Sequence, residues 1–256
     1  MRNFNLNELG TTIALVSTLT LAGCATLAKP NTPPEQTMLE PNGQTYNVDP
    51  FESYNRKMFA FNNEVNQHVL EPINKAYTKT VPLPGRKGIS NFFSNAGGIS
   101  VVANDMLQNN WTWALQDTTR FVLNTTLGIF GIFDVASDVG LPARDQSFSL
   151  TFAKWGVTYS PYLILPVFGP NTVRGSVGLI PEYWAYPIGY VDPHYVREGA
   201  EALYFVQLTS LLLPKQQMIN GLALDPYIAV RNAYLQNSDY LVQLVDAGTS
   251  TPNESD

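Results

Sequence analysis

The chain has 256 residues, enough for one domain with a sizeable core or at most two, and we interpret it as one. Its 15 basic and 21 acidic residues give a formal net charge of −6, which argues against nucleic acid as a partner because that role needs a basic surface. Charged residues make up only 14 % of the chain, so much of the surface must be uncharged.

The first 23 residues are typical of a secretory signal peptide, with an apolar run from Ile13 to Ala22 that is too short to span a membrane. The run ends in Leu21-Ala22-Gly23-Cys24, which resembles the bacterial lipobox. That resemblance implies cleavage before Cys24 and acylation of Cys24, a permanent membrane anchor. Because Cys24 is the only cysteine, no disulfide can form within the chain. Ala25 stands where inner-membrane lipoproteins of enteric bacteria typically carry Asp, which by analogy favours the periplasmic face of the outer membrane.

Residues 24–48 are expected to be the lipidated cysteine and a flexible tether, followed by one α-helical domain over residues 49–247 and a polar tail over 248–256. Asp49-Pro50-Phe51-Glu52 predicts a helix start with Asp49 as the N-cap. The amphipathic pattern continues to about Leu70, where Pro72 is expected to bend or end the helix.

Two short helices are expected at Ile89–Phe93 and Ile99–Leu107, separated by a glycine pair, and a third at Trp111–Asn124. The third helix leads into the central stretch Thr119–Ser137, which has no charge and no proline between Phe121 and Phe133. As a helix, that apolar part would be about 20 Å long, short of the roughly 30 Å hydrocarbon core of a bilayer. Such a segment suits one leaflet or a lined cavity, and a buried core helix is the alternative.

The segment Trp155–Val173 carries no charge and is bent by prolines, so it is expected to be an internal loop or to lie in a membrane interface. A short helix is expected at Ser147–Trp155, a longer one at Tyr195–Leu213, and a last helix at Tyr227–Val245 behind Asp225-Pro226. Strand patterns are scarce. The predicted fold class is therefore mainly α.

The inventory of catalytic side chains is thin. The only histidines, His68 and His194, stand far apart in sequence and neither has metal-ligand spacing. A G-x-S-x-G nucleophile motif and a phosphate-binding glycine loop are both absent. Glu182 and Asp192 could be imagined as an acid/base pair, but scattered carboxylates usually face solvent. We predict no catalytic residue, no metal, no cofactor and no enzymatic activity, which leaves a binding or conduit protein.

Several segments resemble the MlaA/VacJ family of outer-membrane lipoproteins. They are DPFESYNRKMFAFN at Asp49–Asn62, the central stretch, Phe148–Gly178, and LDPYIAVRNAYLQ at Leu224–Gln236. The resemblance implies a mainly helical, ring-shaped bundle of short amphipathic helices, embedded in the inner leaflet of the outer membrane with a central channel. It also implies as partners phospholipid, a trimeric outer-membrane porin and a soluble periplasmic phospholipid carrier. The implied function is a passive conduit that removes mislocalised phospholipid from the outer leaflet and so maintains lipid asymmetry.

Two groups of residues are hypothesised to serve that function. The channel or gate group is Asn124, Thr125, Gly128, Phe130, Gly131 and Phe133. Within it, Asn124 and Thr125 are expected to face headgroups, and the two glycines to act as hinges, with close helix packing as the alternative. The membrane-interface group is Trp155, Tyr159, Tyr162, Trp184 and Tyr186, with an ordinary aromatic core as the alternative.

Arg56, Arg120 and Arg231 are interpreted as structural ion pairs rather than lipid-phosphate ligands. Three positions depart from the usual family pattern: Ala153 where Gly is common, Ser160 where Gly is common, and Gly175 where Asp is common. The departure at Gly175 removes a carboxylate that could pair with Arg174. Two alternatives of other classes stay open, a structural lipoprotein that only tethers or stabilises a porin, and an esterase or phospholipase with an unrecognised site.

Overall fold

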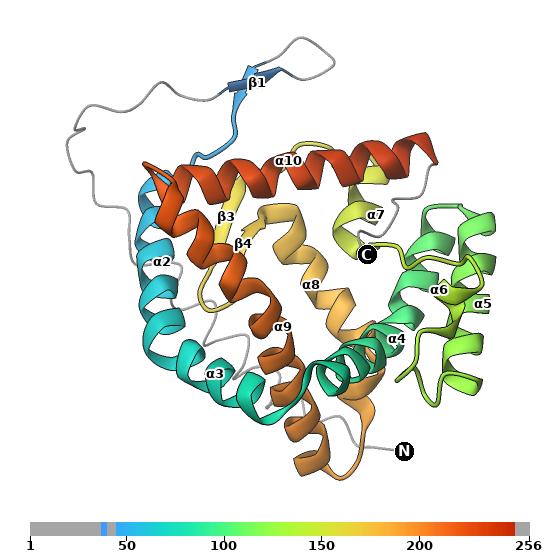
Figure 1. The fold of residues 1–256 in the computed structure, drawn as a ribbon. Helices are drawn as coiled ribbons and strands as arrows, with labels where there is room; N and C mark the ends of the chain where they lie inside the picture. Colours follow the sequence, from blue (N-terminus) through green and yellow to red (C-terminus); the bar gives the residue numbers. More distant parts are fainter. Residues whose placement is uncertain (1–36, 40–44, 249–256) are drawn as a thin grey trace. The chain divides into compact units, whose positions relative to one another are not determined.

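The computed structural model describes residues 37–39 and 45–248. The expected signal peptide, the lipidation site Cys24 and residues 249–256 of the expected tail lie outside the described residues. Within the described part, helices dominate, which confirms the mainly α fold class (Figure 1). None of the helices described there combines the length and the apolar character that crossing a membrane requires.

The elements follow one another from two short strands through a series of helices interrupted by one hairpin. They are β1 (Thr37–Leu39), β2 (Thr45–Asn47), α2 (Glu52–Val65), η1 (Asn66–Leu70), α3 (Glu71–Thr80), α4 (Leu83–Leu107), α5 (Trp111–Thr126), α6 (Val135–Asp138), α7 (Phe148–Lys154), β3 (Tyr162–Leu165), β4 (Gly169–Thr172), α8 (Val173–Ala185), η2 (Pro187–Tyr190), α9 (His194–Leu222) and α10 (Pro226–Ala247). The antiparallel pair β1–β2 lies in the stretch expected to be a tether. Val48, also placed in that tether, is buried in the core.

The first helical segment ends at Leu70, as expected, and the chain continues directly into α3, whose first turn contains Pro72. Helices α2 and α3 are joined by the π-helical turn η1, in which the N–H of Glu71 donates to the carbonyl of Asn66. Proline normally clashes with the carbonyl four residues earlier, and the wider π-helical turn accommodates the ring. Pro72 therefore sits in the first turn of α3, where its missing N–H costs little.

Helix α4 is one continuous helix of 25 residues, so the prediction of two short helices around Gly97 and Gly98 is wrong. The glycines serve packing instead of breaking the helix, Gly97 against the ring of Tyr186 and Gly98 against α5. A β-carbon built at Gly98 would lie 3.3 Å from Cδ2 of Phe121 on α5, tighter than ordinary contact. Small residues at this crossing let the two helices approach closely.

The core joins the start of the folded part to β3 and α10. Its buried members are Val48, Tyr162, Ile164, Tyr227 and Leu235. Tyr162 and Ile164 alternate along β3, so both side chains point to the same, inner face. Strand β3 pairs antiparallel with β4, Tyr162 opposite Thr172 and Leu165 opposite Gly169. The internal interpretation of Trp155–Val173 fits β3, whereas Val167 and Phe168 in the turn are exposed, and the membrane-interface interpretation stays a prediction.

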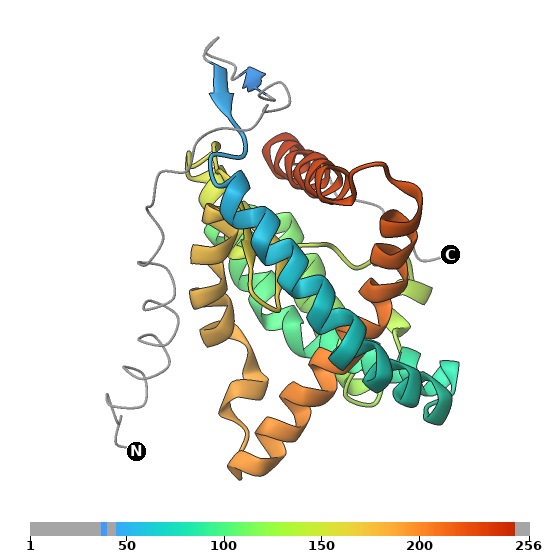
Figure 2. The ribbon, with the colours of Figure 1, turned by 90° about the vertical axis from the view of Figure 1, so that its left-hand side faces the viewer.

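The last two helices are longer than expected and are joined by a short turn. Helix α9 continues through Pro214 to Leu222. Helix α10 begins as predicted, because the side chain of Asp225 accepts a hydrogen bond from the N–H of Ile228 at 3.2 Å. It ends at Gly248, whose φ of 66° is the left-handed conformation that closes many helices. Helix α10 contacts both α7 and α9, and Figure 2 views it nearly end-on.

Candidate functional site: an apolar loop above buried ion pairs

The central stretch is not one helix. Helix α5 ends at Thr126, and Leu127–Phe133 forms a loop, called the apolar loop below, before Asp134 caps α6. Ile129, Phe130 and Gly131 all have positive φ values, of 53°, 57° and 88°. Such values are costly for Ile and Phe, so the surrounding contacts must impose them. The prediction of a helical rod to Phe133 is therefore wrong.

The backbone of the apolar loop supplies those contacts. The N–H of Gly131 donates to the carbonyl of Asn124 at 2.8 Å, and the N–H of Phe130 to that of Thr125 at 3.0 Å. The N–H of Phe133 donates to the carbonyl of Gly128 at 2.9 Å. The N–H groups of Phe130, Gly131 and Phe133 therefore have hydrogen-bond partners within the chain. The loop can expose its apolar side chains without leaving these N–H groups unpaired.

The apolar loop is unusually exposed for its composition. Its exposed side chains are Leu127, Ile129, Phe130, Ile132 and Phe133. Phe130 alone is 70 % exposed. A contiguous exposed apolar patch is uncommon on a soluble monomer and often marks a contact surface. This surface is therefore suited to contact lipid or another apolar partner.

Gly128 and Gly131 are required by close packing, which was the alternative to their role as hinges. A β-carbon at Gly128 would collide with the main-chain oxygens of Phe133 and Asn124. A β-carbon at Gly131 would collide with the side chain of Asn95 on α4. The hinge role stays a prediction.

Asn124 and Thr125 differ in what they face. Asn124 is buried: its amide donates to Asp134 at 2.8 Å and its oxygen accepts the N–H of Ala136 at 2.9 Å. The prediction that Asn124 faces headgroups is wrong, because both functions of the amide fix the loop to α6. The hydroxyl of Thr125 is half-buried and accepts a hydrogen bond from Asn95 at 2.9 Å, and its predicted role stays open.

An ion pair lies beneath the apolar loop. Arg120 of α5 contacts Asp134 at 2.7 Å and also donates to Ser137 and to the carbonyl of Leu141. Burial opposes ionisation of Asp134, but hydrogen bonds from Ser137, Arg120 and Asn124 outweigh it, and the pKa of Asp134 lies below its usual value. The interpretation of Arg120 as a structural ion pair is confirmed.

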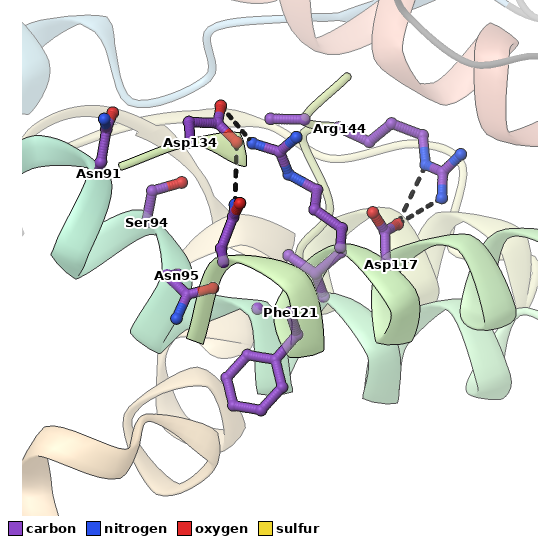
Figure 3. A pocket seen from close by; sticks show the side chains of 12 residues that line it. Asn91, Ser94, Asn95, Asp117, Phe121, Asp134 and Arg144 are labelled. Carbon is purple, nitrogen blue, oxygen red and sulfur yellow. Dashed lines mark hydrogen bonds and ion pairs between the residues drawn. The ribbon is translucent and has the colours of Figure 1, made fainter. Parts of the chain in front are cut away.

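A small polar cavity lies between α4 and α5 beside this ion pair (Figure 3). Asn91, Ser94 and Asn95 line it from α4, and Asp117 and Phe121 from α5. Its volume of about 50 Å³ has room for a few water molecules and not for a phospholipid headgroup. The cavity is therefore too small to be a formed headgroup pocket.

The far wall of the cavity holds a second, more deeply buried charge cluster that the sequence analysis missed. Arg144 contacts Asp117 at 2.5 Å and donates to the carbonyl of Trp113 at 3.0 Å. Behind Asp117, the carboxyl of Asp105 on α4 is fully buried and has no ordinary hydrogen-bond donor among the described residues. Burial, and next the neighbouring Asp117, raise the pKa of Asp105 to about 8, so Asp105 is protonated at neutral pH and can donate to Asp117. The polar pair Asn104-Asp105 inside the apolar run from Val101 to Leu107 was the available signal.

The predicted interface aromatics divide into three kinds. Trp155 and Trp184 are exposed, and the indole of Trp155 donates to the carbonyl of Leu107 at 3.0 Å. Tyr159 and Tyr186 are half-buried, and their hydroxyls donate to carbonyls of the chain. Tyr162 has no exposed surface, so the prediction that it lies at a membrane interface is wrong. The interface role of the other four stays a prediction.

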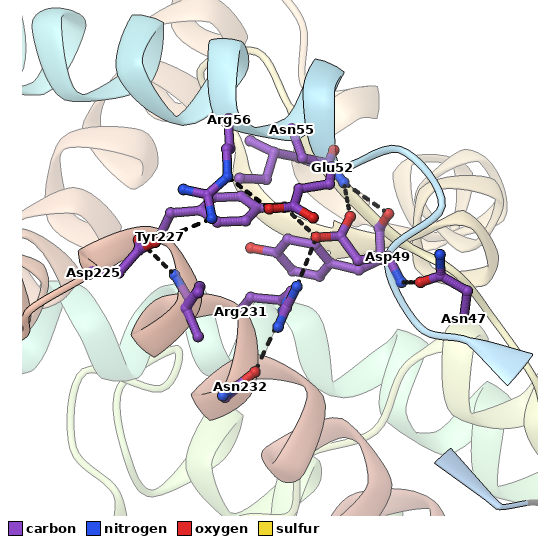
Figure 4. A network of polar contacts seen from close by, with 12 residues as sticks. Asn47, Asp49, Glu52, Asn55, Arg56, Asp225, Tyr227, Arg231 and Asn232 are labelled. Atoms are coloured by element: carbon purple, nitrogen blue, oxygen red, sulfur yellow. Dashed lines mark hydrogen bonds and ion pairs between the residues drawn. The ribbon is translucent and has the colours of Figure 1, made fainter. Parts of the chain in front are cut away.

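The first and last motif segments meet in one polar network (Figure 4). Asp49 is not the N-cap it was predicted to be, since α2 begins at Glu52. Its carboxylate instead accepts hydrogen bonds from Asn55 at 2.8 Å, from Arg231 at 3.0 Å and from the hydroxyl of Tyr227.

Arg56 extends this network. It bridges Glu52 at 2.8 Å and Asp225 at 3.0 Å, and its guanidinium lies 4.4 Å from the ring centroid of Tyr227. Arg56 and Arg231 are thus structural ion pairs, as interpreted from the sequence.

The positions that depart from the family pattern are accommodated locally. Ser160 accepts the N–H of Arg174 at 2.7 Å, at the start of α8. The Arg174 guanidinium donates to Ser149 at 3.2 Å and to two main-chain carbonyls, so it is satisfied without a carboxylate at position 175. A β-carbon at Gly175 would collide with Asn171. Ala153 is buried in α7.

Metal chemistry has no support in the described part of the chain. No group of three or more His, Cys, Asp or Glu residues is placed there to hold a metal ion.

The fold and the site together define a mainly helical protein that holds an exposed apolar loop next to one partly buried and one buried ion pair. Residues 47–241 match the family model described as MlaA lipoprotein. The chain belongs to the MlaA lipoprotein family.

Relatives of similar length support this membership. A protein of Escherichia coli named "Intermembrane phospholipid transport system lipoprotein MlaA" is 32 % identical over 212 residues, 81 % of this chain and 82 % of the relative. The Haemophilus influenzae protein of the same name is 29 % identical over 251 residues, 94 % of each chain. An uncharacterised protein of Rickettsia felis is 34 % identical over 203 residues, 79 % of this chain and 81 % of the relative.

A solved structure is also similar. It is described as "Structural basis for maintenance of bacterial outer membrane lipid asymmetry", superposes with a TM-score of 0.66 at 32 % identity, and covers 76 % of this chain and 98 % of its own.

Proposed function

We propose that this protein is a phospholipid-transport lipoprotein of the outer membrane, which removes mislocalised phospholipid from the outer leaflet and passes it to a soluble periplasmic carrier. The names of the Escherichia coli and Haemophilus influenzae relatives support phospholipid transport between membranes. The description of the similar solved structure supports maintenance of lipid asymmetry. The observation that carries the proposal is the apolar loop, which sets exposed apolar side chains next to the partly buried Arg120–Asp134 ion pair and a small polar cavity.

The proposed role is non-catalytic and passive. Phospholipid is amphipathic, so a conduit must offer its acyl chains an apolar surface and its headgroup a polar one. In this proposal Phe130 and Phe133 meet acyl chains, and Thr125 stands near the headgroup path. The ring shape with a central channel, the position in one leaflet, and the association with a trimeric porin belong to the same proposal.

The energetics favour insertion of the apolar loop into lipid. Fully burying a Phe or Leu side chain is worth about 1.5–3 kcal/mol relative to leaving it in water. Several such side chains in one short loop add to the anchor that acylated Cys24 would provide. Exposed Trp155 and Trp184 fit the headgroup region, where Trp is favoured.

The test is the phospholipid that co-purifies with the full-length protein, with and without porin, identified by mass spectrometry. We expect intact phospholipid with the wild type and several-fold less with Phe130→Glu, which places a charge on the apolar loop. Phe130→Leu is the matched control, because it keeps an apolar side chain at the same position and should retain phospholipid.

The other outcomes separate the alternatives. Absence of phospholipid from every sample contradicts the conduit and favours a protein that only tethers porin. Lysophospholipid with free fatty acid favours an esterase or phospholipase. Equal retention by Phe130→Glu and wild type would remove the apolar loop from the proposal.

A further inference from the structure

A second pocket lies away from the apolar loop, between the π-helical turn with its flanking residues and the C-terminal half of α9. Its lining residues are Asn63, Asn66, Gln67, Glu71, Leu213, Gln216, Gln217 and Asn220. We call it the carboxamide pocket. Its volume of about 330 Å³ falls in the range of small-molecule sites, whereas the cavity under the apolar loop does not.

Part of the lining is already fixed by hydrogen bonds between amides. Asn66 donates to the oxygen of Gln216 at 3.0 Å, and Gln216 donates to the oxygen of Asn63 at 2.9 Å. Asn220 donates to the same oxygen of Asn63 at 3.4 Å. This series of hydrogen bonds joins two helical segments about 150 residues apart in sequence and sets the orientation of each amide.

The remaining amide groups are unused. The side-chain oxygen of Asn220 is buried and has no hydrogen-bond partner among the described residues. That oxygen is closed to solvent, so it adds a desolvation cost within the wall and is not itself a group that a bound ligand reaches. Gln67 and Gln217 line the pocket, are exposed, and make no side-chain hydrogen bond within the described part of the chain. The wall that carries Asn66 and Gln67 is the π-helical turn η1, a conformation that is frequent at functional sites.

The side chains that line the pocket limit the classes of ligand it can bind. A carboxamide both donates and accepts, which matches a hydroxyl group that does the same. The one charged lining residue, Glu71, is paired with Lys75 at 2.5 Å, and no cation lines the pocket to hold a phosphate. No aromatic side chain lines it either, so the stacking used for bases and sugar rings is missing.

We propose that the carboxamide pocket binds the vicinal hydroxyl groups of a glycerol moiety. Two sources carry this group, the terminal glycerol of a phosphatidylglycerol headgroup and a free glycerophosphodiester. The lipid source rests on the proposed function, because it requires phospholipid at the protein; the free source does not. With phosphatidylglycerol, the diol enters the pocket and the phosphate stays outside it.

The experiment compares lipid retention by the full-length protein in detergent, read out by native mass spectrometry. The probes are phosphatidylglycerol and phosphatidylethanolamine with identical acyl chains, and soluble glycerophosphoglycerol as competitor. We expect the wild type to prefer phosphatidylglycerol by about fivefold, the effect of roughly one net hydrogen bond. Gln217→Leu and Asn220→Leu should abolish the preference. Gln236→Leu, an exposed position on α10, is the matched control and should keep it.

Each outcome decides a separate point. A preference lost only in the pocket variants supports the lipid source. Binding of glycerophosphoglycerol that is lost in those variants, without lipid preference, supports the free source, and it does so even if no phospholipid is retained and the proposed function fails. Retention of phospholipid without preference and without glycerophosphoglycerol binding overturns this inference and leaves the proposed function intact. A preference unchanged in both pocket variants also overturns it, because the selective site then lies elsewhere.

Discussion

Arg231 and Asp49 form a buried ion pair, with the guanidinium nitrogen 3.0 Å from the carboxylate and side-chain exposures of 7 % and 2 %. The two residues stand 182 positions apart in sequence. Asn55 and Tyr227 supply further hydrogen bonds to the same carboxylate, so the charge is well solvated by the protein. The motifs that identify the family thus act here as a clamp between the start of the fold and its last helix.

Removing the carboxylate should leave Arg231 buried and unpaired. We expect Asp49→Ala to lower the free energy of unfolding by about 3–5 kcal/mol, the usual cost of breaking a buried pair. Glu52→Gln, which alters the half-exposed pair with Arg56, should cost less than about 1 kcal/mol. Denaturant unfolding in detergent measures both, and similar losses for the two variants would argue against the clamp.

The buried Asp105 should make stability depend on pH. Its pKa is raised from 3.8 to about 8 in the fold, so between these values the folded state holds a proton that the unfolded state releases. Stability therefore falls as pH rises through this interval and stops falling above about pH 8. We expect the melting temperature to decline between pH 5 and pH 8, measured by circular dichroism.

Asp105→Asn tests the origin of that decline. The amide keeps a donor toward Asp117 and cannot ionise, and Arg144 retains its pair with Asp117. The variant should show a flatter profile and a higher melting temperature than the wild type at pH 8. Asp145→Asn, at an exposed position, should keep the wild-type slope. An unchanged slope in Asp105→Asn would assign the pH dependence to other groups.

Gly131 should tolerate alanine worse than Gly140, although both have positive φ values, of 88° and 86°. The left-handed backbone alone costs roughly 1–2 kcal/mol for a non-glycine residue. At Gly140 a β-carbon would meet nothing within 4 Å, whereas at Gly131 it collides with Asn95. We expect the larger loss of unfolding free energy for Gly131→Ala, and partial rescue when Asn95→Gly is added, because the closest contact is with Cβ of Asn95. Equal losses of unfolding free energy at the two glycines would show that the apolar loop shifts to relieve the clash with Asn95.

Tyr162 should tolerate loss of its hydroxyl. The side chain is fully buried and its hydroxyl oxygen has no hydrogen-bond partner among the described residues. An unsatisfied buried polar group costs about 1–3 kcal/mol, so Tyr162→Phe should keep or raise the melting temperature. Tyr162→Ala should lower the free energy of unfolding by about 3–5 kcal/mol through the cavity it leaves. A clear loss with Tyr162→Phe would show that the hydroxyl has a partner.

Local rules predicted the helical class and several helix limits. Asp225 and Pro226 started a helix as expected, because an N-cap side chain and a fixed φ act within a few residues. The same Asp-Pro pattern did not place an N-cap at Asp49, because its carboxylate accepts hydrogen bonds from Arg231 and Tyr227 instead. A tertiary partner so distant in sequence leaves no local signal.

Continuity of the helices and the shape of the apolar loop also depended on distant contacts. Gly97 and Gly98 disfavour a helix by propensity, yet Tyr186 packs against Gly97 and Phe121 of α5 packs against Gly98. The positive φ angles of Ile129 and Phe130 depend on hydrogen bonds from the loop back to α5 and on the close contact between Gly131 and Asn95. A sequence pattern shows neither. For the candidate site, the sequence located the apolar surface correctly but could not show that Asn124 turns inward.

The clamp between Asp49 and Arg231 also orders events during biosynthesis. Because the chain is made from its N-terminus, Asp49 appears long before the helix that carries its partner. Until α10 arrives, this end of the fold holds a carboxylate that water must hydrate, and Tyr162 and Val48 lack the covering side chains of Tyr227 and Leu235. Contacts of such long sequence separation form late and slow the final step. A chain truncated before α10 would thus be recognisable to proteases as incomplete, since its core stays open on the side that the last helix closes.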